Sequence, residues 1–189
     1  CRHDARAMET ASAILRSPVS PMETPTLIAV IGGARPTPKM AAAAEEVGRA
    51  LAQKGVGVVC GGLGGVMEAV CRGAVSEGGL TVGILPSSRA EDANQWVQIR
   101  IPTGIGFARN PLVVRAGAAV IAIDGSYGTL TEIGFALVDN IPVVALNSWE
   151  ISLAGRPIEH GIHRVDTPAE AASLAVELAA RRPVDGNRS

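Results

Sequence analysis

The stretch DGSYGTLTE, residues 124–132, contains the residue types and turns in this chain that could most readily do chemistry. It follows the apolar run AAVIAI and precedes the helical pattern IGFALVDN, so we expect it to join a buried strand to a helix. Backbone N–H groups in such a turn can hold a phosphate, and Ser126 in this context could act as a nucleophile. Thr129–Glu132 also fits T-x-x-E, a capping box in which Glu132 would only cap the helix.

Glycines also follow two other apolar runs, LIAVI and VGVVC. A glycine lets the backbone turn sharply and approach a ligand, although many such turns contain glycine only for packing. The carboxyl ends of parallel strands meet at one edge of a sheet, which is where such folds bind ligands. Glycine-rich turns after three strands therefore predict a small phosphorylated ligand at that edge. The residues expected to bind it are Gly32, Gly33, Gly61, Gly62, Gly64, Gly65, Gly125, Ser126, Tyr127, Gly128 and Thr129.

Two charged residues are the candidates for side chains that act on this ligand. Arg109 lies in TGIGFARN at an expected loop-to-helix boundary, and a guanidinium can clamp a phosphate through two hydrogen bonds. A solvated surface arginine is the plainer alternative. Glu132 lies one turn into a helix that begins at the same glycine-rich edge, where a carboxylate could reach the ligand.

The spacing of other residues argues against several classes of site. GGLGG does not match G-x-G-x-x-G, and no acidic residue follows VGVVC to bind a ribose hydroxyl, which disfavours a dinucleotide dehydrogenase. The P-loop pattern is absent, which argues against ordinary NTPase chemistry. Cys1, Cys60 and Cys71 lack metal-ligand spacing, so we expect no metal site and free thiols in a reducing, cytoplasmic location.

A serine hydrolase remains a third hypothesis. In G-x-S-x-G, Asp124 would replace the first glycine, at a position where close packing usually excludes a side chain. His160 or His163 follows Ser126 in the right chain order to complete a triad.

The amino-acid composition limits the classes of protein to which this chain could belong. A chain of 189 residues with 47% hydrophobic residues predicts one globular domain. A net charge of -1 and 3% aromatic residues argue against a nucleic-acid partner, and no apolar run is long enough to predict a membrane span. We expect a flexible N-terminal extension over residues 1–25, one domain over 26–182 and a flexible tail over 183–189.

Short apolar runs alternate with helical patterns along the whole of this domain. Strands that are apolar on both faces predict a parallel sheet covered on both sides by helices. With right-handed crossovers, the fold class is α/β, a doubly wound, mainly parallel Rossmann-like sheet with helices on both faces.

Three motifs together, CGGLGGVMEAVCRGA, GFARN and GSYGTLTE, resemble the LOG-like branch of the Rossmann superfamily from about Leu27 to Trp149. This branch includes cytokinin riboside 5′-monophosphate phosphoribohydrolases, often mislabelled as lysine decarboxylases, and molybdenum cofactor carrier proteins. The chain most resembles the bacterial carrier-like subgroup. Lys39 and Lys54 are its only lysines and neither has a motif around it, so a pyridoxal-phosphate decarboxylase is rejected.

The family pattern P-G-G-x-G-T-x-x-E is matched by Gly125, Gly128, Thr129 and Glu132, whereas Asp124 replaces the proline and Ser126 the second glycine. The resemblance implies that Arg109 and Glu132 form a catalytic pair. It also implies a homodimer or higher homo-oligomer with the active site near the subunit interface.

Two principal hypotheses follow. In the first, the protein hydrolyses the N-glycosidic bond of a nucleoside 5′-monophosphate to a free base and ribose 5-phosphate, with Glu132 stabilising positive charge at C1′ and no cofactor required. In the second, it is a non-catalytic carrier of molybdopterin. Both predict a bound phosphorylated ligand, either a nucleotide monophosphate or molybdopterin, and no nucleic-acid or membrane partner.

Overall fold

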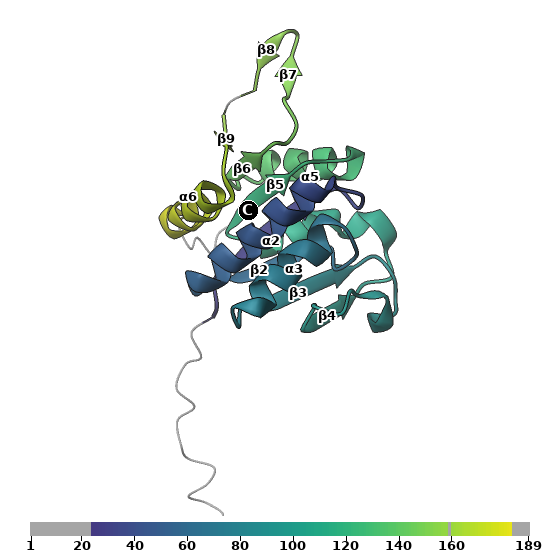
Figure 1. Ribbon diagram of the computed structural model, residues 1–189. Helices are drawn as coiled ribbons and strands as arrows, with labels where there is room; N and C mark the ends of the chain where they lie inside the picture. The colour runs from purple at the N-terminus through teal and green to yellow at the C-terminus, as the bar shows by residue number, and fades with distance from the viewer. Residues whose placement is uncertain (1–23, 159, 183–189) are drawn as a thin grey trace, which may run out of the picture.

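A computed structural model describes residues 24–158 and 160–182 (Figure 1). The expected N-terminal extension lies almost wholly outside these residues, and the expected C-terminal tail lies outside them entirely. Seven strands form one sheet in the order β4-β3-β2-β1-β5-β6-β9, and every pairing within it is parallel. The strands are β1 Leu27–Gly32, β2 Gly57–Cys60, β3 Thr81–Leu85, β4 Ile99–Pro102, β5 Ala119–Ile123, β6 Val143–Leu146 and β9 Ile162–Val165.

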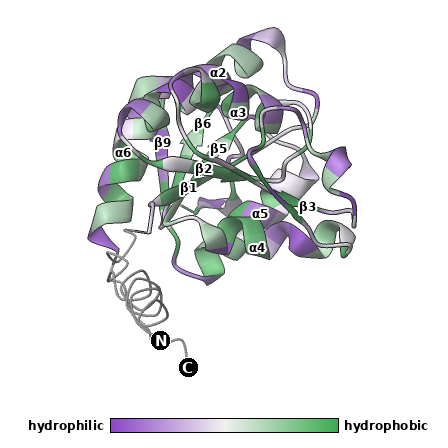
Figure 2. Cartoon of the chain, turned by 90° about the horizontal axis from the view of Figure 1, so that it is seen from below, coloured by the Kyte–Doolittle hydropathy of each residue, from purple (hydrophilic) through white to green (hydrophobic). Residues whose placement is uncertain are grey.

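Helices cover both faces of this sheet, which confirms the predicted doubly wound α/β class. The α-helices are α2 Pro38–Gln53, α3 Val66–Ser76, α4 Asn110–Ala116, α5 Tyr127–Val138 and α6 Pro168–Arg181. Figure 2 shows α2, α3 and α6 on one side of the strands and α4 and α5 on the other. Each side has its own buried apolar cluster because successive strand residues point to opposite faces.

The helix boundaries follow ordinary capping chemistry. Thr37 caps α2 by accepting the Met40 N–H, with Pro38 in the first turn. Thr167 caps α6 by accepting the Glu170 N–H, and the Glu170 carboxylate accepts the Thr167 N–H in return.

Two short 3-10 helices and a hairpin complete the described structure. The 3-10 helices are η1 Ala90–Asp92 and η2 Gly106–Arg109, and η2 leads directly into α4. Strands β7 Ser152–Leu153 and β8 Arg156–Pro157 form a small antiparallel hairpin that the sequence did not predict. Within residues 24–158 and 160–182, no helix is long and apolar enough to cross a membrane.

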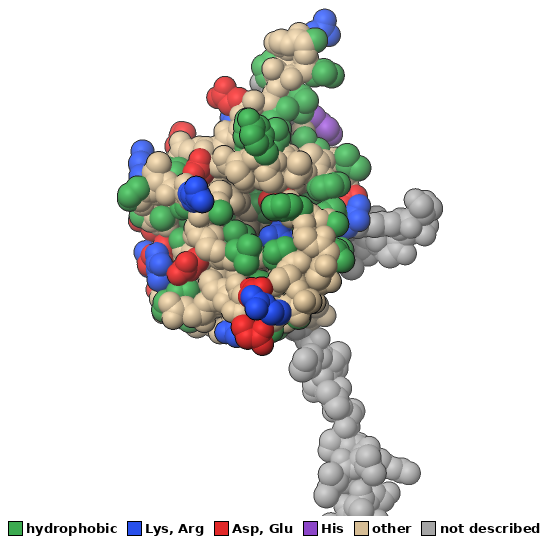
Figure 3. All heavy atoms as spheres, turned by 90° about the vertical axis from the view of Figure 1, so that its right-hand side faces the viewer, with side chains coloured by type: hydrophobic (Ala, Val, Ile, Leu, Met, Phe, Trp, Pro, Cys, Tyr) green, Lys and Arg blue, Asp and Glu red, His purple; other side chains and the backbone are tan. Residues whose placement is uncertain are grey.

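The strand order reverses direction between β1 and β5. The helix that follows β1 packs on one face of the sheet, and the helix that follows β5 packs on the other. Their amino ends therefore diverge and leave a hollow at the carboxyl ends of these two strands. Figure 3 faces this edge, where hydrophobic side chains surround a basic side chain near the centre of the view.

Close packing between α2 and α3 depends on a glycine in each helix. A Cβ on Gly48 would lie 2.1 Å from the Val70 carbonyl oxygen, and one on Gly73 would lie 1.9 Å from the Glu45 carbonyl oxygen. These are contacts with backbone, which cannot move aside as a flexible side chain can. Gly134 in α5 is the opposite case, since its Cβ would meet nothing within 4 Å.

We therefore predict opposite effects of alanine at two helical glycines. Gly48→Ala forces the two helices apart and should lower the free energy of unfolding by about 3 kcal/mol. Gly134→Ala adds no clash and should raise it by about 0.5–1 kcal/mol, because alanine favours the helix. Urea denaturation of both variants measures the two values. A Gly48→Ala protein as stable as the wild type would contradict the close approach of α2 and α3.

Candidate functional site

The hollow between β1 and β5 is an open cavity of about 230 Å³. It brings together residues that lie far apart in the sequence, from the end of β1, the loop after β2, η2 and the start of α5. Seven of the residues singled out from the sequence line it: Gly32, Gly61, Arg109, Ser126, Gly128, Thr129 and Glu132. The other six, Gly33, Gly62, Gly64, Gly65, Gly125 and Tyr127, lie outside its lining.

Arg109 and Glu132 form a buried ion pair in this lining. Only 6% of Arg109 and 7% of Glu132 are exposed, and Arg109 Nη1 lies 3.3 Å from Glu132 Oε1. The same nitrogen donates to Asn110 Oδ1 at 3.0 Å, and Nη2 donates to the Gly61 carbonyl at 3.4 Å. Arg109 Nε is buried and has no hydrogen-bond partner within the described part of the chain. The guanidinium is thus held in place by hydrogen bonds at Nη1 and Nη2, whereas Nε has no hydrogen-bond partner among the described residues.

Gly61 is required by the arginine rather than by a turn. A Cβ at this position would lie 2.3 Å from Arg109 Nη2 and 2.7 Å from the Met67 sulfur. The missing side chain leaves room for the guanidinium against the end of β2. Arg109 can reach this position because η2 and α4 meet at it, with Pro111 in the first turn of α4.

Burial sets the charge properties of the pair. It raises the pKa of the Glu132 carboxyl to about 7, while the nearby Arg109 charge acts to lower it. Burial also lowers the pKa of the Arg109 guanidinium, although an arginine in a protein remains protonated at neutral pH. Glu132 can therefore exchange a proton near neutral pH, which is a property expected of an acid–base catalyst.

The amino end of α5 faces the cavity from the other side. Ser126 is the N-cap, and its N–H donates to Thr129 Oγ1 at 3.2 Å. No acidic side chain lies in the first turn of α5, whereas Glu68 lies in the first turn of α3. Because the positive end of a helix dipole attracts anions, α5 is the better of these two phosphate-binding positions.

The interpretation of Thr129–Glu132 as a capping box was wrong. The helix begins at Tyr127, three residues earlier than that pattern requires, so Thr129 occupies the third helical position instead of the cap. Glu132 consequently lies in the second turn, where its carboxylate contacts Arg109. In this position Glu132 does not cap the helix, so helix capping does not explain the presence of a glutamate there.

Several of the glycines have a packing explanation. A Cβ on Gly32 would lie 2.5 Å from the Ile123 carbonyl oxygen, and one on Gly65 would lie 2.5 Å from the Gly33 carbonyl oxygen. Gly65 also has a φ of +71°, which glycine adopts without strain. These residues allow β1, β5 and α3 to approach one another, and this close approach shapes the cavity.

Ser126 is not arranged as a nucleophile. It is the N-cap of α5, and in the described residues no hydrogen bond joins it to either of the histidines considered for a triad. His163 lies on β9, at the far edge of the sheet beyond β6. The structure therefore gives the serine hydrolase hypothesis no support.

Seven residues of the cavity lining were not predicted from the sequence, among them Asn110 and Phe107. Asn110 is 5% exposed and accepts a hydrogen bond from Arg109, and Phe107 lines the cavity although its ring is 84% exposed. Asn110 directly follows Arg109, so its place next to the candidate arginine was the one sign in the sequence that Asn110 could belong to the site. Nothing in the sequence pattern indicated that Phe107 would lie in the cavity lining.

The cysteines and carboxylates give no metal site in the described residues. Cys60 and Cys71 are free and buried, with their sulfur atoms 3.6 Å apart. Within residues 24–158 and 160–182, no group of three or more His, Cys, Asp or Glu side chains is placed to hold a metal ion.

Comparison with known proteins places this chain in a family. The model of the SLOG cluster4 family matches residues 25–172. An uncharacterized protein from Archaeoglobus fulgidus is 38% identical over 149 residues, which cover 79% of this chain and 93% of that protein.

Two solved structures are similar over nearly their whole length. The molybdenum cofactor binding protein from the phototrophic bacterium Rippkaea orientalis has a TM-score of 0.72 at 29% identity, covering 83% of this chain and 98% of its own. The Moco carrier protein from Chlamydomonas reinhardtii has a TM-score of 0.72 at 26% identity, covering 84% of this chain and 100% of its own. These similarities confirm the resemblance to LOG-like and carrier-like proteins.

The raised pKa of Glu132 predicts a pH-dependent stability. An unfolded glutamate has a pKa of about 4.3, so between about pH 4.5 and 7 the native carboxyl is protonated while the unfolded one is ionised. The contribution of Glu132 to the free energy of unfolding should then fall as pH rises, by up to about 1.4 kcal/mol per pH unit. Glu132→Gln should remove this slope, as urea denaturation at pH 5, 6, 7 and 8 would measure.

The exposed Glu77→Gln is the matched control and should keep the wild-type slope. If the Glu132→Gln protein shows the same slope as the wild type, Glu132 does not titrate near neutral pH.

Proposed function

We propose that this chain, which belongs to the SLOG cluster4 family and has a LOG-like Rossmann fold, hydrolyses the N-glycosidic bond of a nucleoside 5′-monophosphate. The observation that carries the proposal is the buried Arg109–Glu132 pair in a cavity beside the amino end of α5. A binding protein has no evident need to bury an ion pair with an unsatisfied guanidinium nitrogen at the bottom of its cavity. An enzyme that must stabilise developing charge does have that need.

The geometry supports a role for each part of the site. The 5′-phosphate would lie at the amino end of α5, where the helix dipole and backbone N–H groups favour it. The ribose would then occupy the cavity with C1′ towards Glu132. As the C1′–N bond breaks, positive charge develops at C1′, and the ionised Glu132 carboxylate would stabilise that charge.

Water completes the reaction. Its oxygen bonds to C1′, and one of its protons passes to the ionised Glu132 carboxylate. The departing base takes the bonding electron pair of the C1′–N bond and then receives this proton from Glu132, directly or through solvent, which returns Glu132 to its ionised form. A carboxyl with a pKa near 7 suits this exchange, since it can accept and release a proton at neutral pH. Arg109, which lines the cavity, would orient the nucleotide or stabilise the departing base. The products are a free base and ribose 5-phosphate.

A second candidate function is the binding and carriage of molybdopterin. It is favoured by the similarity to the molybdenum cofactor binding protein of Rippkaea orientalis and to the Chlamydomonas reinhardtii carrier, both matched over 98% or more of their length. A molybdopterin also carries a phosphate, which the amino end of α5 would hold in the same way. The two functions therefore differ in whether a bond is broken, and not in where the phosphate lies.

The hydrolytic function predicts base release. The purified protein should release free base and ribose 5-phosphate from at least one member of a panel of nucleoside 5′-monophosphates. Chromatography of the reaction mixtures would measure the released base. Glu132→Gln should reduce the rate by about 10²–10⁴-fold, because glutamine keeps the size and shape of the side chain but has no carboxylate. Glu77→Gln should keep the full rate. A panel without base release, or a Glu132→Gln protein with the wild-type rate, would rule out this function.

The carrier function predicts a different result from the same protein. A pterin with its characteristic fluorescence should co-purify with the chain and should be retained in Glu132→Gln, since carriage needs no acid. Base release that depends on Glu132, together with no bound pterin, would count against the carrier.

A further inference from the structure

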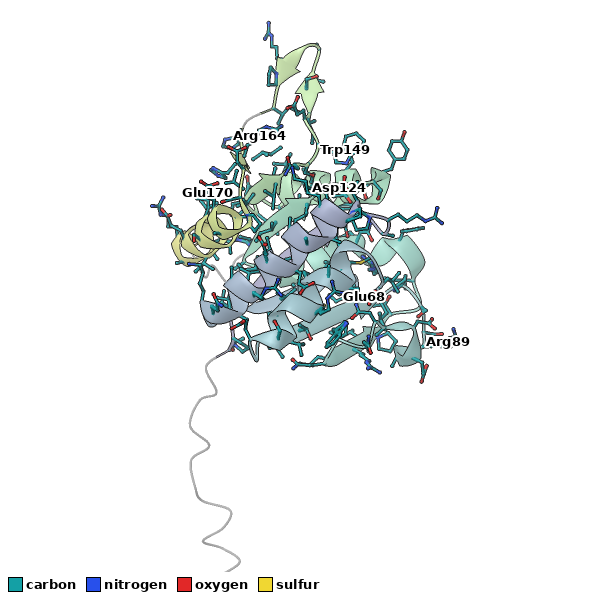
Figure 4. The ribbon with its side chains drawn as sticks, viewed as in Figure 1. Glu68, Arg89, Asp124, Trp149, Arg164 and Glu170 are labelled. Carbon is teal, nitrogen blue, oxygen red and sulfur yellow. The ribbon has the colours of Figure 1, made fainter. Side chains whose placement is uncertain are left out.

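A second hollow lies at the turn that follows β5. It has a volume of about 230 Å³ and is lined by Asp124, Gly125, Asn147, Ser148 and Trp149. These residues follow β5 and β6, and Figure 4 shows Asp124 and Trp149 near each other at the ends of these strands. None of the five lines the cavity of the Arg109–Glu132 pair. We call this second hollow the outer hollow.

Trp149 forms one wall of the outer hollow and pairs with Tyr127, which lies beside it outside the lining. Trp149 Nε1 donates to the Ser126 carbonyl at 3.1 Å, and the Trp149 ring lies 6.1 Å from that of Tyr127, tilted by 30°. Gly125 makes room for the indole, because a Cβ there would lie 2.6 Å from Trp149 Nε1. Tyr127 is 82% exposed. The pair is therefore a preformed surface on which a planar ring could stack.

The polar wall of the outer hollow is a carboxylate without a partner. Asp124 is half-buried, and its carboxylate takes part in no hydrogen bond or ion pair with the described residues. Its backbone is fixed, since its N–H donates to the Leu146 carbonyl and its carbonyl accepts the Ser148 hydroxyl at 2.6 Å. A fixed, half-buried carboxylate with free acceptor positions is suited to a ligand that presents N–H donors.

A carboxylate beside an aromatic surface selects a particular class of ring. The 2-amino-4-oxopyrimidine edge presents a ring N–H and an amino N–H side by side, which match the two oxygens of a carboxylate. Guanine and pterins share this edge. Adenine lacks it, because its ring nitrogen at the corresponding position is an acceptor.

We propose that the outer hollow binds a planar ring with a 2-amino-4-oxopyrimidine edge, stacked on the Tyr127–Trp149 pair and hydrogen-bonded to Asp124. This subsite is separate from the Arg109–Glu132 cavity and does not depend on the proposed hydrolysis. The turn 125–129 contributes Gly125 to the outer hollow and Ser126, Gly128 and Thr129 to the cavity.

Binding to the full chain tests this proposal. In the Glu132→Gln background, where no nucleotide would be consumed, isothermal titration should show guanosine 5′-monophosphate and a simple pterin binding at least about tenfold more tightly than adenosine 5′-monophosphate. Adding Asp124→Asn, which keeps the size of the side chain, should weaken both ligands by about 10–100-fold and remove the preference over adenine. Trp149→Ala should weaken both by about tenfold or more.

Controls keep the result interpretable. Asp124 has a φ of +55°, which suits glycine, so Asp124→Gly removes the carboxylate without strain if the asparagine variant fails to fold. Asn140 has a similar φ of +52° far from this hollow, and Asn140→Gly should leave binding unchanged. If only guanosine 5′-monophosphate or only the pterin binds and Asp124→Asn abolishes it, the subsite stands and its ligand is identified. Equal affinity for the adenine nucleotide, or wild-type affinity in both Asp124 variants, would overturn the proposal.

Discussion

A guanidinium and a carboxylate share a cavity from which most of their surrounding water is excluded, and much of the surrounding structure serves this pair. Removing each ion from water costs several kcal/mol, and the mutual attraction repays this only with good geometry and further hydrogen bonds. Here the further bonds come from Asn110 and the Gly61 carbonyl, and Gly61 has no side chain because the guanidinium fills that space. The compensation is incomplete, since Arg109 Nε is unpartnered within the described residues and burial outweighs the ion pair in setting the pKa of Glu132. Incomplete compensation of this kind is typical of functional sites.

The sheet provides the position at which such a pair can face a ligand. Because α2 and α5 follow neighbouring strands but cover opposite faces, their amino ends separate and open a hollow between β1 and β5. The glycines at the ends of these strands bring backbone segments closer than side chains would permit, at Gly32 against Ile123 and at Gly65 against Gly33. Packing and the proposed ligand binding thus depend on the same glycine-rich turns. The glycine pattern is consistent with both functions, and it does not separate them.

Most of the fold could be predicted from the sequence, because buried parallel strands appear as continuous apolar runs separated by helical patterns. The edge of the sheet that carries the site followed from the glycines after those runs. The role of Glu132 could not be decided in this way, since T-x-x-E fits a capping box and the true cap, Ser126, depends on where β5 ends in three dimensions. Asn110 and Phe107 were missed because their place in the cavity comes from η2 and α4 packing across the sheet, which no local pattern reports. The outer hollow was missed for the same reason, as it joins residues after two different strands.

The central claim is that a phosphorylated sugar binds with its phosphate at the amino end of α5 and its anomeric carbon towards Glu132. A crystal structure of the protein with ribose 5-phosphate tests it most directly. The account predicts phosphate oxygens accepting hydrogen bonds from backbone N–H groups in residues 125–129, with C1 of the ribose within contact distance of the Glu132 carboxylate. A phosphate bound instead at the amino end of α3, or a sugar whose C1 faces away from Glu132, would contradict it.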